Sequence, residues 1–111
     1  MRYFCHNGQR TGTVYHEFFK GEWKDGDGFW NDGSICLHDD LFSGSGFERI
    51  LKEALSDYDR YSGTLIYPED WEEVCRLAKK AGGTAGDIVD EAALWVEDAF
   101  ENCGCFTILG L

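Results

Sequence analysis

Histidine, cysteine and aspartate side chains, which often bind metals or act in catalysis, are spread over this 111-residue sequence. Asp25 and Asp27 give the Asp-x-Asp start of a calcium loop, which also needs a third acidic ligand, a central glycine and a terminal glutamate. Phe29, Trp30 and Cys36 stand at those three places. The segment therefore fits a hairpin turn better than a calcium site.

Three short segments hold the residue types of a zinc site: Cys5–His6, Cys36–His38 and Cys103–Cys105. None has the usual spacing of zinc ligands. Neighbouring residues on a strand point to opposite faces, so Cys5 and His6 would not ordinarily bind the same ion. We expect no metal or other cofactor, and structural zinc is kept as the weaker alternative.

A catalytic nucleophile needs a base beside it and a group that orients the base. His16, His38 and the cysteines supply the residue types. The sequence has no Gly-x-Ser-x-Gly elbow, no phosphate-binding loop and no His-Glu-x-x-His pair. The pair Asp39-Asp40 fits a solvated turn better than an acid/base dyad. We expect a protein that is not an enzyme, with a small metal-dependent or thiol enzyme as the third alternative.

Acidic residues lie beside aromatic ones in several segments that are expected to be loops. Trp and Tyr are common anchors of protein interfaces, and carboxylates around them would attract a basic partner. The alternative is that these rings belong to the core of a small sheet. We predict that the partner-binding residues are Trp23, Asp25, Asp27, Trp30, Asp32, Asp39, Asp40, Asp57, Tyr58, Asp59 and Tyr61.

The first forty residues have the pattern of antiparallel strands, because aromatic and β-branched residues alternate with polar ones between Gly-containing turns. A small meander is the simplest assembly. Its strands are expected at residues 2–6, 13–19, 29–30 and 34–38.

The remaining residues have helical spacing. Helices are expected at residues 46–56, 68–81 and 85–102, with a short strand at 64–67 and a buried C-terminal strand within 105–111. Pro68 and the acidic residues that follow it suit the start of the second helix. The sequence therefore predicts an α+β fold with an N-terminal antiparallel meander, three helices and a C-terminal strand that joins the sheet.

The size and composition fit one domain, residues 1–111, with a hydrophobic content of 43%. The N-terminus lacks the apolar stretch of a signal peptide, and no segment reaches the ~20 apolar residues of a membrane span. We expect a cytoplasmic protein with its five cysteines reduced, most of them in the core.

Twenty-one acidic and ten basic residues give a formal net charge of −11. A negative surface repels phosphate, so direct binding to nucleic acid or to an anionic membrane is disfavoured. A basic protein is the natural partner. The alternative is that the charge serves only to keep the chain in solution.

Three stretches resemble the small acidic immunity proteins of bacterial polymorphic-toxin and contact-dependent inhibition systems: residues 29–34, residues 67–73, and the C-terminal helix and tail from Trp95 to Gly110. The resemblance implies an inhibitor that neutralises one cognate basic toxin domain, often a nuclease, by covering its active site or an adjacent surface. The resemblance is to the class of protein, and it does not identify binding residues in this chain.

A phage-encoded acidic anti-defence inhibitor or nucleic-acid mimic is the second hypothesis. Mimicry predicts regularly spaced carboxylates throughout the contact, whereas toxin inhibition allows a mixed aromatic and acidic one. The sequence leaves open whether the chain is a monomer or a dimer.

Overall fold

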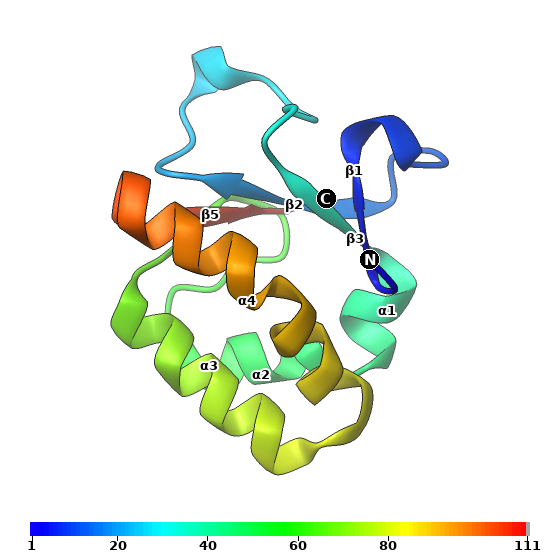
Figure 1. The fold of residues 1–111 in the computed structure, drawn as a ribbon, viewed down its shortest axis with the longest axis vertical. Helices are drawn as coiled ribbons and strands as arrows, with labels where there is room; N and C mark the ends of the chain where they lie inside the picture. The colour runs from blue at the N-terminus through cyan, green and yellow to red at the C-terminus, as the bar shows by residue number, and fades with distance from the viewer. Residues whose placement is uncertain (111) are drawn as a thin grey trace.

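The computed structural model describes residues 1–110 and confirms the α+β class. Across these residues, five strands form one antiparallel sheet, and the three longer of four α-helices cover one of its faces (Figure 1). The strands are β1 (Phe4–His6), β2 (Tyr15–Lys20), β3 (Ile35–His38), β4 (Thr64–Ile66) and β5 (Phe106–Leu109). The helices are α1 (Asp39–Gly44), α2 (Phe47–Ala54), α3 (Pro68–Ala81) and α4 (Gly83–Cys103), with short 3-10 turns η1 (Asn7–Gln9) and η2 (Asp25–Asp27).

The strand order is β1-β3-β2-β5-β4, which differs from a simple meander because β1 pairs with β3 and not with β2. β3 holds Ile35 and Leu37, which are both fully buried, whereas β1 ends at the exposed His6. The more apolar strand therefore takes the inner position. The C-terminal strand was predicted correctly, and it lies between β2 and β4.

Strand positions alternate between the two faces of the sheet. Phe18 of β2 and Phe106 of β5 point into the core, where their rings stack with centroids 5.7 Å apart. Trp71 of α3 meets Phe106 edge to face at 5.5 Å. The neighbouring residues Glu17 and Thr107 consequently point to the opposite, helix-free face.

Two segments differ from the sequence-based prediction. Residues 29–30, expected as a strand, lie in a loop, and Trp30 has a positive φ of 65° that no strand allows. The pair Asp39-Asp40, expected as a turn, begins the six-residue helix α1, which His38 caps by accepting a hydrogen bond from Asp40 N.

Candidate functional site

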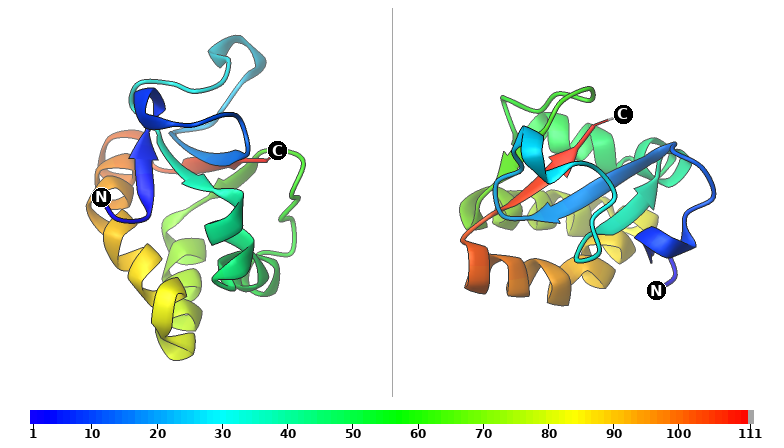
Figure 2. Two further views of the ribbon diagram at one scale, coloured as in Figure 1. Left: turned by 90° about the vertical axis from the view of Figure 1, so that its right-hand side faces the viewer. Right: turned by 90° about the horizontal axis from the view of Figure 1, so that it is seen from above.

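The helix-free face of the sheet carries a hollow of about 450 Å³. Its floor is formed by Tyr15 and Glu17 of β2 and by Leu109 of β5, which is the register partner of Glu17. Four more aromatic rings form its walls, those of Trp23, Phe29, Trp30 and Tyr61. We call this site the aromatic hollow. Figure 2 shows the loop after β2 rising from the face that the helices leave open.

That loop, residues 21–33, is called the aromatic loop. It is tied to β5 by Thr107, whose hydroxyl accepts a hydrogen bond from Trp23 N at 3.1 Å and donates to Gly21 O at 2.7 Å. The indole of Trp23 donates to Gly28 O at 2.6 Å and stacks on Phe29 with centroids 5.2 Å apart. The two rings are thus held as a pair by backbone contacts within the loop.

Glu17 holds the far end of the aromatic loop. Its carboxylate accepts hydrogen bonds from the backbone N–H groups of Trp30 at 2.6 Å and Asn31 at 2.9 Å, and from the Ser34 hydroxyl at 2.6 Å. Glu17 is only 1% exposed. A buried carboxylate is stable when donors surround it, so these bonds explain both the burial of Glu17 and the left-handed backbone of Trp30.

The ring of Trp30 also contacts the positively charged side chain of Arg10. The guanidinium carbon of Arg10 lies 3.7 Å from the ring centroid, and Arg10 itself does not line the hollow. This distance is well within the range of a cation–π contact. Trp30 therefore both lines the hollow and contacts Arg10.

The opposite rim of the hollow comes from residues 55–63, the rim loop between α2 and β4, which contributes Tyr61, Ser62 and Gly63. This loop crosses the chain just after β5, at Gly110, whose N–H donates to Ser62 O at 3.1 Å. A Cβ at Gly110 would lie 2.1 Å from Arg60 O. The absence of a side chain at Gly110 is therefore what lets the rim loop pass so close.

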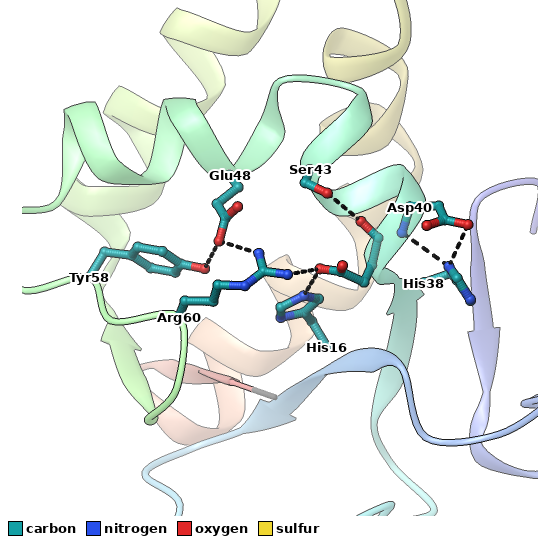
Figure 3. A network of polar contacts seen from close by, with 8 residues as sticks. His16, His38, Asp40, Ser43, Glu48, Tyr58 and Arg60 are labelled. Atoms are coloured by element: carbon teal, nitrogen blue, oxygen red, sulfur yellow. Dashed lines mark hydrogen bonds and ion pairs between the residues drawn. The ribbon is translucent and has the colours of Figure 1, made fainter.

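A polar network fixes the rim loop from the other side (Figure 3). Arg60 donates to Asp39 Oδ1 and to Glu48 Oε2, each at 2.6 Å. Tyr58 donates to the same Glu48 oxygen at 3.1 Å, and His16 Nε2 donates to Asp39 Oδ1 at 2.9 Å. Arg60 thus joins the loop to α1 and α2, and Asp39 joins it to β2.

Burial sets the protonation of this network. Burial lowers the pKa of His16 below its ordinary 6.5 and outweighs the hydrogen bond to Asp39, so the imidazole is neutral. Burial alone would raise the pKa of Asp39, but its hydrogen bonds to His16 and Arg60 lower the pKa below its ordinary 3.8. His16 is fully buried and stacked on Phe42 at 3.7 Å. The charged groups satisfy one another, so the network acts as a structural clamp.

The structure brings three of the predicted aromatic residues together, because Trp23, Trp30 and Tyr61 all line the aromatic hollow. The predicted residues Asp25, Asp27 and Asp32 are exposed on the aromatic loop, and Asp57 and Asp59 are exposed on the rim loop. Two of these carboxylates also hold local backbone, since Asp27 accepts from Lys24 N and Asp59 from Tyr61 N, each at 2.8 Å.

Three of the predicted residues lie elsewhere. Asp39 and Tyr58 point inward to the polar network, and Asp40 is exposed beside His38 at the start of α1. Sequence reasoning missed Tyr15, Glu17 and Phe29 as parts of the hollow. The alternation along residues 13–19 could have placed Tyr15 and Glu17 on one face, but it does not say that this face is the one without helices.

The cysteines and histidines do not gather in one place. All five thiols are free, and within residues 1–110 no group of three or more His, Cys, Asp or Glu side chains is placed to hold a metal ion. Burial raises the pKa of Cys36 to about 12 and that of Cys75 to about 11, which leaves both as unreactive thiols.

Comparison with known proteins adds no assignment, since no protein family, curated protein or solved structure matches this chain. None of the helices in the described part of the chain has the length and apolar character that crossing a membrane requires. The aromatic hollow is therefore interpreted from its own chemistry.

Proposed function

We propose that this chain is an inhibitory binding protein of the immunity type, which docks a basic toxin domain against the helix-free face of its sheet. The aromatic hollow is the main observation that supports this proposal. It presents five rings in one place on a strongly acidic protein, and two of them are open to solvent, Phe29 at 61% exposed and Tyr61 at 75%. Exposed rings gathered at one concave place are typical of an interface.

The charge supports a cationic partner. The net charge is −11, and four of the ten basic side chains are already paired with acids, those of Lys20, Arg60, Arg76 and Lys79. The aromatic loop carries exposed carboxylates at Asp25, Asp27 and Asp32. Such a surface accelerates encounter with a positively charged protein and repels nucleic acid.

The same features suggest how inhibition would work. A nuclease binds phosphate through clusters of Lys and Arg, and these clusters are the groups that the acidic rim would attract. Rings seated at the centre of the contact would then exclude water and slow dissociation. The toxin would lose access to its substrate without any chemical step by the inhibitor.

The first test pairs the chain with the protein encoded next to it in its native genome. Co-expression in a bacterial host should relieve growth inhibition by that neighbour, and the purified pair should form a complex. Phe29→Ala combined with Tyr61→Ala should weaken the affinity about 100-fold, at about 1.4 kcal/mol for each anchor. Biolayer interferometry measures this change.

Leu94→Ala is the matched control, because Leu94 is an 81% exposed apolar side chain on α4, away from the helix-free face. It should leave both affinity and protection unchanged. A neighbour that does not bind, or a complex that tolerates the double substitution but not Leu94→Ala, would contradict the proposal.

A further inference from the structure

We infer that the aromatic hollow is a receptor for a guanidinium group, the side chain of an arginine that the partner protein inserts. This inference rests on the proposed function and names the chemistry that its central contact recognises. It follows from the charge of the lining, the faces of the rings and the size of the hollow.

The lining selects for positive charge. Among residues 1–110, no Lys, Arg or His side chain lines the hollow, and its single carboxylate is Glu17. The donors to Glu17 named above are neutral groups, two backbone amides and a hydroxyl, so its negative charge is solvated but not cancelled. The Glu17 carboxylate attracts a cation and repels an anion, and these effects are stronger in a site of low dielectric constant.

The aromatic rings of the hollow also favour a cationic ligand. A cation is attracted to the negative face of an aromatic ring, most strongly to Trp, and the hollow presents Trp23 and Trp30 together with Tyr15 and Tyr61. The protein itself already uses this contact, since Arg10 lies over Trp30 from outside the hollow at 3.7 Å. Trp30 thus already binds one guanidinium and also lines the hollow.

A guanidinium fits better than an ammonium. It is planar, stacks on ring faces and is more weakly hydrated, so it loses less hydration free energy in a site walled by rings. The volume of about 450 Å³ admits an extended side chain, within the roughly 300–1,000 Å³ usual for small-ligand pockets. We therefore assign the hollow to arginine in preference to lysine.

The test uses Nα-acetyl-arginine amide as a probe, titrated into the intact chain at physiological salt and followed by NMR of the indole and aliphatic signals. Saturable shifts are expected at Trp23, Trp30 and Leu109, with a dissociation constant on the order of millimolar for one such group. The lysine counterpart should bind at least three-fold more weakly. The citrulline counterpart, which keeps the planar shape but has no charge, should bind at least ten-fold more weakly.

A variant provides the second arm. Tyr61→Leu combined with Phe29→Leu keeps apolar bulk at two exposed positions while removing the π faces, and should weaken arginine binding at least five-fold with an unchanged urea midpoint. Tyr67→Leu, at a 46% exposed tyrosine that does not line the hollow, is the control and should bind as the parent chain does.

Equal binding of arginine and citrulline, equal binding of arginine and lysine, or shifts without saturation would each overturn the inference. The proposed function can fail separately. If arginine saturates the hollow but the partner complex tolerates Phe29→Ala with Tyr61→Ala, the docking proposal falls and the guanidinium site stands. If the partner needs those rings but arginine and citrulline bind alike, the guanidinium site falls and the docking proposal stands.

Discussion

At the scale of single residues, one buried carboxylate organises the candidate site. Trp30 has a positive φ of 65°, and a side chain in this left-handed region costs about 1–2 kcal/mol. The hydrogen bonds from Trp30 N and Asn31 N to Glu17 offset this cost, because bonds to a charged acceptor are the stronger ones. Glu17 thereby holds in place the residue that both lines the aromatic hollow and contacts Arg10.

His16 gives the molecule a pH dependence whose sign follows from its burial. Burial lowers the pKa of His16 in the folded state below 6.5, against the pull of Asp39. Below that pH the unfolded chain takes up a proton that the folded chain does not. The free energy of unfolding should therefore be fully maintained above pH 6.5 and should fall as the pH drops from there toward the pKa of the folded state.

Urea denaturation at several pH values between 7.5 and 5 measures this effect. His16→Phe keeps a ring against Phe42 and removes the titrating group, so the variant should lose less stability than the parent chain over that interval. His6 and His38 are present in both proteins and cancel in the comparison. A parent chain that loses no more stability than the variant would show that folding does not lower the pKa of His16.

At the scale of elements, the rim loop is held on one side by the end of β5 and on the other by the polar network. A Cβ at Gly110 would meet Arg60 O at 2.1 Å and Ser62 N at 2.8 Å. Gly110→Ala should therefore push the rim loop away from β5 and loosen the contacts of Arg60. We expect a loss of about 1–3 kcal/mol, the usual range for overpacking.

Urea denaturation reports the loss, and NMR shifts at Tyr61 report the loop. Gly8→Ala is the matched control, since a Cβ at Gly8 meets nothing within 4 Å, and should change stability by no more than about 0.5 kcal/mol. Similar midpoints for the two variants would mean that the rim loop is not held against Gly110.

The elements with strong local signals could be predicted from the sequence. The helix at 68–81 was predicted with the bounds that α3 has, because Pro68 begins it, acidic residues occupy its first turn and Lys79 and Lys80 its last. β5 was predicted from the apolar C-terminal tail, and α4 was predicted from a long stripe of apolar residues at helical spacing. In each case the residues that decide the structure lie inside the element itself.

The candidate site was only partly predictable, because its key contacts join distant residues. Residues 29–30 look like a strand until Glu17, thirteen positions earlier, binds the backbone of Trp30. Asp39 looks solvated until Arg60, twenty-one positions later, pairs with it. Aromatic and acidic composition did indicate Trp23, Trp30 and Tyr61, but no local pattern showed that their rings would share a hollow with Tyr15.

At the scale of the whole molecule, all three long helices pack on one face of the sheet, and the proposed docking uses the other face. The helix-covered face is filled by the core, so the opposite face of the sheet is left to the aromatic loop and the rim loop (Figure 2). Both loops carry exposed aspartates. The rings of the aromatic hollow and part of the surplus negative charge therefore lie on the same side of the protein.

The association kinetics of the proposed complex test whether the partner docks on the helix-free face. Asp25→Lys with Asp32→Lys reverses two exposed charges on the aromatic loop. Docking on this face predicts an association rate constant at least about ten-fold lower at low salt, with the difference shrinking as salt rises. Glu97→Lys with Glu101→Lys makes the same change in net charge on exposed positions of α4 and should slow association far less. Equal slowing by the two double variants, or none by either, would contradict docking on the helix-free face.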